Sequence, residues 1–187
     1  MGRNPLQRFA QLLWEEVANL HPRYRLCDWA ISCLPHLCFN RTRTSLYRLA
    51  GFSMGKNICF MGRVHISGGG RIQDRFRLGD DVLMNSPVLF DVNAPITIGS
   101  SVSIGHDVKF ITTSHEIGTA VKRAGTTTAA AIVVEDGVWI GAGAIILAGV
   151  TIGHGSIIAA GTVVNASVPP NTLIAPKPNR QIPLPTD

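Results

Sequence analysis

The sequence predicts an all-β solenoid, a parallel β-helix made of six-residue repeats, preceded by a short helical segment. Three observations predict it. Every sixth residue is aliphatic over a long stretch, and the position four residues later is always small or β-branched. Glycine is abundant at 19 residues, whereas aromatic residues make up only 6%. Short flat strands that meet at tight corners need this combination of one inward aliphatic residue per strand and small residues at the turns.

The repeat is regular in the second half of the chain and looser before it. The first series reads Val134, Ile140, Ile146, Ile152, Ile158 and Val164, and the second reads Val138, Ala144, Val150, Ser156, Thr162 and Val168. Upstream, the same offsets hold Ile98, Ile104 and Phe110, with Val102 and Val108, after a looser set of Ile72, Leu78, Met84 and Phe90. A period of six fits neither the 3.6 of a helix nor the alternation of a long strand. Three strands per triangular coil account for it.

Length and composition suit one domain with an appended segment. The 187 residues are 45% hydrophobic, which is enough for a core, and the shortage of aromatics predicts a thin interior of Ile, Val and Ala. Charge is uneven along the chain, since residues 1–77 hold 12 Lys/Arg against 4 Asp/Glu and residues 78–187 hold 5 against 8. A basic first half suits an anionic partner or a solvated surface, and the sequence leaves both open.

The cysteines and the N-terminus predict a cytoplasmic protein. Cys27, Cys33, Cys38 and Cys59 form no C-x-x-C pair and lie beside no histidines at zinc-ligand spacing, so we expect reduced thiols and no metal. The first twenty residues contain Glu15 and Glu16 and lack a small-residue cleavage site, unlike a secretory signal. The apolar stretch 26–39 is too short and interrupted to span a bilayer, although it could lie on a membrane surface.

Residues 1–54 are expected to be a helical N-terminal segment. An amphipathic helix is indicated by Phe9, Leu12, Leu13, Glu16 and Val17, and a second helix should run from about Arg41 to Ala50 and end at Gly51. Residues 1–50 carry seven arginines against three acidic residues. They could dock on an anionic membrane, or they could close the open end of the solenoid as capping elements do. Capping is the default prediction.

The segments ITIGSSVSIGHD (96–107) and VVEDGVWIGAGAIILAGVTIGHGSIIAAGTVV (133–164) resemble the hexapeptide-repeat acyltransferases. The branch with galactoside, maltose, nodulation-type and polysaccharide O-acetyltransferases is the most similar, over roughly residues 55–182. The resemblance implies a left-handed parallel β-helix over residues 55–170, a C-terminal extension over 171–187, and acetyl-CoA as acyl donor without a metal. It also implies a homotrimer with active sites between subunits.

The repeat is interrupted once, by an inserted loop at about residues 111–133 that contains His115. Acyl transfer to a hydroxyl needs a base, and imidazole, with an ordinary pKa of about 6.5, suits that task near neutral pH. The resemblance implies that His115 is the catalytic base. Glu116 could orient it, but adjacent side chains usually diverge. The other five histidines are expected to be structural or exposed.

The resemblance implies further site residues. Asn85 and Asp91 would hydrogen-bond the acceptor, although polar residues stacked at the corners of a β-helix give an alternative explanation. Trp139 would lie at the subunit interface beside the active site. The coenzyme would contact the residues Gly141, Ala142, Ala159 and Ala160, and its phosphates would contact Lys177 and Arg180. This chain departs from the family pattern at Asn165-Ala166, Pro176 and Pro183, which lie in the part expected to contact the nucleotide.

Together these features predict a cytoplasmic, acetyl-CoA-dependent O-acetyltransferase that acts on a saccharide, a precursor of cell-surface polysaccharide or glycolipid. Peripheral membrane contact through residues 1–50 stays open. One alternative is a xenobiotic acetyltransferase that modifies an antibiotic hydroxyl. Another is a catalytically silent β-helix scaffold. No nucleic-acid partner is expected, because no reader motif accompanies the basic charge.

Overall fold

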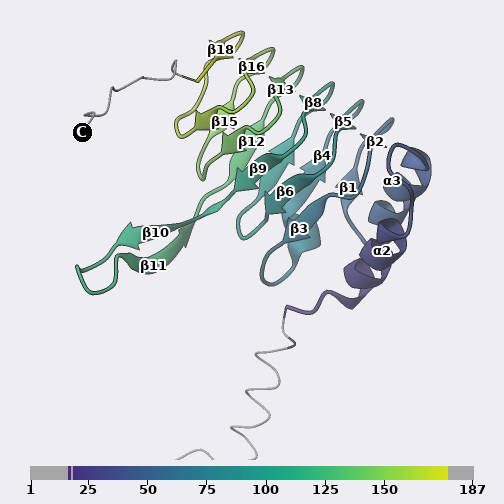
Figure 1. Ribbon diagram of the computed structural model, residues 1–187, viewed down its shortest axis with the longest axis horizontal. Coiled ribbons are helices and arrows are strands. Elements are labelled where there is room, and N and C mark those ends of the chain that lie inside the picture. Colours follow the sequence, from purple (N-terminus) through teal and green to yellow (C-terminus); the bar gives the residue numbers. More distant parts are fainter. Residues whose placement is uncertain (1–16, 18, 177–187) are drawn as a thin grey trace, which may run out of the picture.

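The computed structural model describes residue 17 and residues 19–176, which form a parallel β-helix closed at its N-terminal end by two helices (Figure 1). Sheet A contains β1 (Ser53–Met54), β4 (Phe76–Leu78), β7 (Ile96–Ile98), β12 (Ile132–Val134) and β15 (Thr151–Ile152). Sheet B contains β2 (Cys59–Phe60), β5 (Leu83–Met84), β8 (Ser103–Ile104), β13 (Trp139–Ile140), β16 (Ile157–Ile158) and β18 (Leu173–Ile174). Sheet C contains β3 (His65–Ser67), β6 (Val88–Asp91), β9 (Val108–Ile111), β14 (Ile145–Ile146) and β17 (Val163–Val164).

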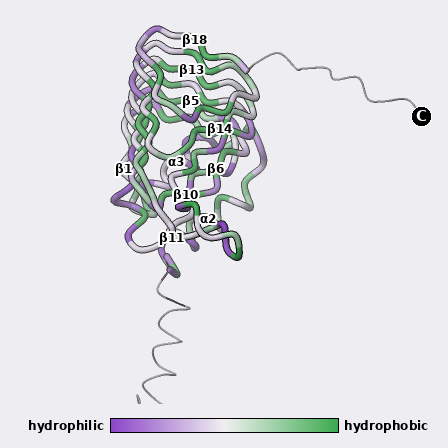
Figure 2. Tube along the Cα trace, turned by 90° about the vertical axis from the view of Figure 1, so that its left-hand side faces the viewer, coloured by the Kyte–Doolittle hydropathy of each residue, from purple (hydrophilic) through white to green (hydrophobic). Residues whose placement is uncertain are grey.

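Each coil runs once through sheets A, B and C, so residues about eighteen apart along the regular repeat become neighbours in a parallel ladder. Ile140, for example, pairs with Ile158 in the next coil, and across the inserted hairpin it pairs with Ile104 in the coil before. All residues of the two predicted series are buried. The six-residue repeat is therefore confirmed as the pattern that fills the interior, and hydrophobic residues recur in every coil (Figure 2).

The prediction of an interior without aromatics is wrong for the first coils. Phe52, Phe76, Phe90 and Phe110 form a continuous column, with ring centroids 5.7, 4.6 and 4.8 Å apart in that order. All four are buried, the last three completely. Low aromatic content did not exclude this column because most of the chain's seven phenylalanines are concentrated in it and in Phe60 beside it.

The helices α2 (Pro22–Ser32) and α3 (Asn40–Leu49) pack on the first coil and close its end. The predicted helix at Arg41–Ala50 is confirmed as α3. The helix α2 was missed, although Pro22 at its first turn is a typical start signal. Of the predicted Phe9–Val17 helix, all but Val17 lies outside the described residues.

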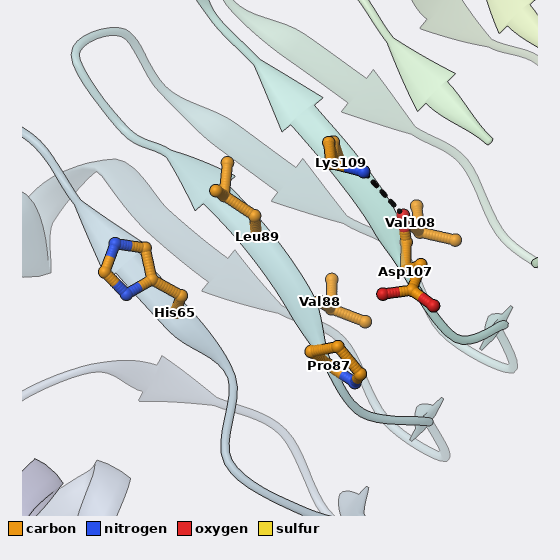
Figure 3. A pocket seen from close by; sticks show the side chains of 7 residues that line it. All are labelled: His65, Pro87, Val88, Leu89, Asp107, Val108 and Lys109. Carbon is orange, nitrogen blue, oxygen red and sulfur yellow. Dashed lines mark hydrogen bonds between the residues drawn. The ribbon is translucent and has the colours of Figure 1, made fainter. Parts of the chain in front are cut away.

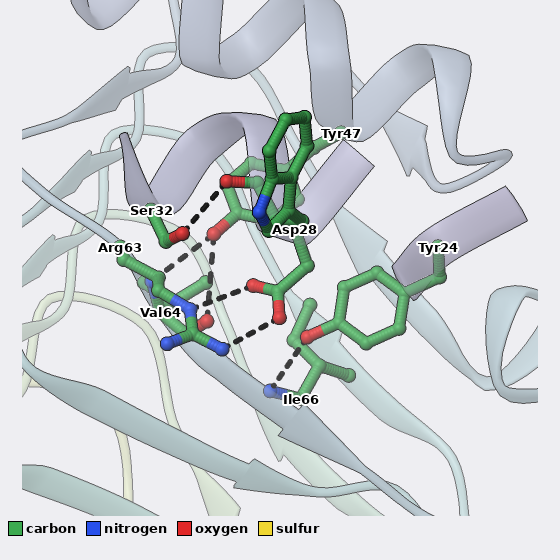
Figure 4. A network of polar contacts seen from close by, with 8 residues as sticks. Tyr24, Asp28, Ser32, Tyr47, Arg63, Val64 and Ile66 are labelled. Atoms are coloured by element: carbon green, nitrogen blue, oxygen red, sulfur yellow. Dashed lines mark hydrogen bonds and ion pairs between the residues drawn. The ribbon is translucent and has the colours of Figure 1, made fainter. Parts of the chain in front are cut away.

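A polar network joins the helical cap to the solenoid (Figure 4). The Arg63 guanidinium donates two hydrogen bonds to the buried Asp28 carboxylate, at 2.8 and 2.6 Å. The Tyr24 and Tyr47 hydroxyls accept hydrogen bonds from the backbone amides of Ile66 and Val64. Because a bidentate pair fixes geometry as well as charge, this network sets the angle at which α2 lies on the first coil.

Two further elements interrupt the coils. A short 3-10 helix, η1 (Ile72–Arg75), precedes β4, and a hairpin of β10 (Thr113–Ile117) and β11 (Ala124–Ala129) separates β9 from β12. The hairpin extends away from the solenoid (Figure 1). Neither of the described α-helices has the length and apolar content needed to cross a bilayer.

Candidate active site

The hairpin leaves the solenoid where the chain turns from sheet C to sheet A, a turn that we call corner CA. The backbone amide of Ala130 donates to the Thr112 carbonyl at 3.0 Å and closes the hairpin's base. Its strands are antiparallel, with His115 opposite Thr127, and the pairing becomes irregular between His115 and Ile117. The interruption of the repeat therefore folds as a β-ribbon that carries the candidate base outside the core.

The His115 side chain is exposed on β10, and its Nδ1 lies 3.2 Å from the Gly125 carbonyl oxygen. A carbonyl can only accept, so this contact is a hydrogen bond when Nδ1 carries the proton. In that tautomer Nε2 has a free lone pair, the form that a general base needs. The orienting group is thus a backbone carbonyl across the hairpin, and no hydrogen bond joins Glu116 to His115 among the described residues.

Gly125 was missed by sequence reasoning. A Cβ atom at this position would lie 2.9 Å from the Glu116 carbonyl oxygen across the hairpin. The two strands approach closely there, so a glycine brings its own carbonyl within reach of the imidazole. A glycine inside a strand was the sequence signal for such a close approach.

Asp91 lies at corner CA, at the base of the same hairpin. Its carboxylate accepts hydrogen bonds from the Thr113 amide at 2.8 Å and from the Asn93 side chain at 2.5 Å. The buried Thr112 hydroxyl donates to the Asp91 carbonyl at 2.6 Å. Asp91 thus anchors the first residue of β10, and its carboxylate oxygens keep lone pairs for an acceptor hydroxyl.

Asn85 lies one corner away, where the chain turns from sheet B to sheet C, a turn that we call corner BC. Its side-chain amide is half-buried and donates to the Ile104 carbonyl at 3.3 Å, one coil above. A hollow opens beside this corner on sheet C, between the side chains of three neighbouring strands (Figure 3). It is lined by His65, Pro87, Val88, Leu89, Asp107, Val108 and Lys109.

Trp139 points outward from sheet B, with 57% of its surface exposed. Its neighbours on the same face are Ser103 below and Ile157 above, and Leu173 continues the column one coil further. A large apolar side chain without cover on a single chain is typical of an interaction surface.

The small residues expected to contact the coenzyme divide into two kinds. The Gly141 amide donates to the Ile158 carbonyl at 2.7 Å, and a Cβ at Gly141 would lie 2.6 Å from the Ala160 nitrogen. The close packing of neighbouring coils therefore requires a glycine at position 141, whether or not a coenzyme binds there. Ala142 is of the second kind: it is exposed, and its amide has no hydrogen-bond partner within the described part of the chain.

The other residues expected to contact the coenzyme lie further along the chain. Ala159 and Ala160 lie one coil above Gly141 and Ala142, at the same corner, whereas Lys177 and Arg180 lie outside the described residues.

A second hollow lies at corner CA under the hairpin, between its base and the following coils. It is lined by Thr113, Ser114, Thr128, Ala130, Leu147, Ala148 and Asn165, so one departure from the family pattern lies here. Over residues 17 and 19–176 no three His, Cys, Asp or Glu side chains gather as metal ligands would.

Within one chain the predicted site residues therefore lie in three separate places. Corner CA holds His115 and Asp91, corner BC holds Asn85 and Ala142, and Trp139 lies on sheet B. The base of the hairpin links Asp91 to the strand of His115 through Thr113, and at corner BC the Gly141–Ala142 segment stacks on Ala159–Ala160.

Comparison with known proteins agrees with this architecture. Residues 131–166 match the family model described as bacterial transferase hexapeptide (six repeats). A hexapeptide-repeat-containing acetyltransferase from Vibrio cholerae is 34% identical in sequence; the match covers 90% of this chain and 92% of that one, with a TM-score of 0.73. A second structure of that protein is a complex with acetyl coenzyme A, with a TM-score of 0.72.

Two sugar acetyltransferases have the same fold. A galactoside acetyltransferase in complex with coenzyme A is 27% identical, with a TM-score of 0.71 over 86% of this chain and 78% of that one. A maltose O-acetyltransferase from Clostridium difficile is 26% identical, with a TM-score of 0.69 over 85% and 82%. A Schizosaccharomyces pombe protein named as an acetyltransferase is 44% identical over 89 residues, which span 48% of this chain and only 43% of that relative.

Proposed function

Because the chain belongs to the hexapeptide-repeat acetyltransferases, we propose that it transfers an acetyl group from acetyl-CoA to a hydroxyl group of a saccharide, with His115 as the general base. The observation that carries the proposal is the near full-length match to the Vibrio cholerae acetyltransferase, which binds acetyl-CoA in one of its structures. The exposed, oriented imidazole on the hairpin supplies the catalytic group that this chemistry needs.

In the tautomer that the Gly125 carbonyl favours, Nε2 of His115 is the atom that accepts and returns the proton. The acceptor hydroxyl loses its proton to Nε2 of His115 while its oxygen attacks the thioester carbonyl carbon. The carbon–sulfur bond then breaks, and the imidazolium returns the proton to the leaving thiolate. During both steps Nδ1–H stays bonded to the Gly125 carbonyl, so the ring keeps its orientation.

The negative charge that develops on the thioester oxygen needs a backbone donor. The exposed Ala142 amide suits this role, since its N–H is free among the described residues while the neighbouring Gly141 N–H is used between coils. A preorganised donor of this kind typically contributes about 10²–10³ in kcat.

The separation of the two corners supports a site shared between subunits. His115 and Asp91 from one chain would meet Asn85, Ala142 and Trp139 of another, and a homotrimer closes such head-to-tail contacts. The partner would also cover the exposed Trp139 surface. We expect a trimer at micromolar concentration by sedimentation, and a fully active monomer would contradict the shared site.

The saccharide acceptor is proposed by likeness to the galactoside and maltose enzymes. The test is release of free thiol from acetyl-CoA in the presence of sugars, nucleotide-sugars or antibiotics. His115→Ala should lower kcat by about 10²–10⁴ and leave the trimer and coenzyme affinity intact. Activity on antibiotics alone would favour a xenobiotic enzyme. If no acceptor in the set causes release of free thiol, a catalytically silent scaffold is favoured.

A further inference from the structure

The outer surface of the helical cap combines exposed apolar side chains with positive charge. The inner face of α2 buries Tyr24 and Ile31 against the solenoid. On the opposite face Leu26 and Trp29, three residues apart and so adjacent on the helix, are 68% and 67% exposed. Capping the solenoid therefore uses only one side of this helix.

The connection from α2 to α3 adds two more exposed apolar residues, Leu37 at 64% and Phe39 at 56%. Both have positive φ angles, 62° and 58°, in the left-handed region that bulky side chains rarely adopt. Such strain persists only where surrounding contacts enforce it, and it is concentrated at functional positions.

The enforcing contacts come from Arg43. Its guanidinium is buried and donates hydrogen bonds to the carbonyls of Leu34, Pro35 and Cys38, while the Leu37 amide donates to the Met61 carbonyl at 2.8 Å. The loop is thus held in one shape that presents Leu37 and Phe39 outward. A rigid apolar projection loses little conformational entropy when it inserts into a partner.

The exposed formal charges of residues 19–51, the segment that forms the cap, are all positive. Arg23 and Arg25 precede Leu26 and Trp29 by three and four residues, so they flank them on the helix surface. Arg41 and Arg48 are exposed on α3. Within residues 19–51 the only carboxylate is Asp28, which is buried and paired with Arg63, so no acidic side chain of this segment opposes the four exposed arginines.

From these observations we infer that the outer surface of the cap, comprising Leu26, Trp29, Leu37, Phe39 and the exposed arginines, docks the protein on an anionic phospholipid bilayer. Tryptophan suits the membrane interface because its ring is apolar and its indole N–H is polar. The leucines and Phe39 would enter the boundary of the acyl chains, and the arginines would contact lipid phosphates. The protein lies on the membrane in this scheme and does not span it.

The test is flotation of the full chain with phosphatidylcholine vesicles that contain either 30% phosphatidylglycerol or none. We expect binding to the anionic vesicles alone, and loss of most of it in 0.5 M salt. The pair Arg23→Gln and Arg25→Gln should weaken binding about 25-fold, from about fivefold per arginine, while the exposed Arg77→Gln on β4 serves as matched control. Trp29→Ser should weaken it by at least about tenfold, and Val121→Ser, on the hairpin, should not.

Phe39→Asn separates docking from a structural role. Asparagine tolerates the left-handed conformation better than phenylalanine, so the melting temperature should rise by about 2–4 °C while vesicle binding falls. Wild-type protein that fails to float with anionic vesicles would overturn the inference, as would Trp29→Ser and the arginine pair binding as well as their controls. If Trp29→Ser instead dissociates copies of the chain, the surface is a subunit interface and the docking inference is wrong.

Discussion

Replacing Asp91 by alanine should loosen the hairpin that carries His115 rather than unfold the solenoid. The substitution removes the carboxylate that accepts the Thr113 amide at 2.8 Å. A hydrogen bond to a charged group contributes about 1.5–3 kcal/mol, and the half-buried site favours the lower part of that range. The Asn93 side-chain amide also donates to the Thr113 hydroxyl at 3.1 Å, and this second link to the hairpin weakens when Asn93 loses its Asp91 acceptor, which adds about 0.5–1 kcal/mol. The total of about 2–3 kcal/mol corresponds to about 30- to 150-fold in the opening equilibrium of the hairpin base.

Hydrogen exchange and steady-state kinetics together measure this effect. The amide of Thr113 should exchange faster by up to that factor, and kcat should fall by no more than the same factor with KM changed less than about threefold. The matched control is Asp136→Ala. The Asp136 carboxylate accepts the Ser100 amide at 2.7 Å, again between coils, but away from the hairpin. The Asp136→Ala substitution should leave kcat unchanged. A large rise in KM with unaltered Thr113 exchange would refute the anchoring role and show that Asp91 binds the acceptor directly.

Gly125→Ala would place a carbon 2.9 Å from the Glu116 oxygen and displace the carbonyl that orients His115, so kcat should fall at least about tenfold and its pH profile should change. Phe90→Ala opens a cavity between two buried rings and should cost about 3–5 kcal/mol in chemical denaturation. Burial raises the pKa of Tyr24 to about 12, so only the unfolded chain loses this proton near pH 10. Stability should therefore fall between pH 10 and 12, by about 2–3 kcal/mol from this group, and Tyr24→Phe should remove that part of the slope.

The six-residue pattern predicted the coils well because a solenoid converts sequence spacing directly into spatial neighbours. Every member of the Val134 series lies in the interior, and the interruption near His115 marks the hairpin. The column of phenylalanines was missed because the earlier coils were recognised only as a looser repeat, and overall composition averages over the chain.

The contacts that orient the site could not be read from spacing. The bond from His115 to the Gly125 carbonyl depends on how two strands of a ribbon pair, and that register is set by the turn between them. Likewise, the second role of Asp91 emerges only because corner CA brings it beside Thr113. Backbone partners of this kind leave no residue-type signal in a single sequence.

The narrow base of the hairpin has a consequence for how such proteins diversify. The insertion joins the solenoid through a few hydrogen bonds at its base, among them those from the Ala130 amide to the Thr112 carbonyl and from the Thr113 amide to the Asp91 carboxylate. Beyond them, Ile132 resumes the ladder by donating to the Pro95 carbonyl at 2.9 Å. The tip of the ribbon, between His115 and Gly125, can therefore change in length or sequence without altering any inward-facing side chain of the coils. Selection can vary this tip while the base keeps its place, so new acceptor preferences can evolve on a scaffold whose stability is preserved.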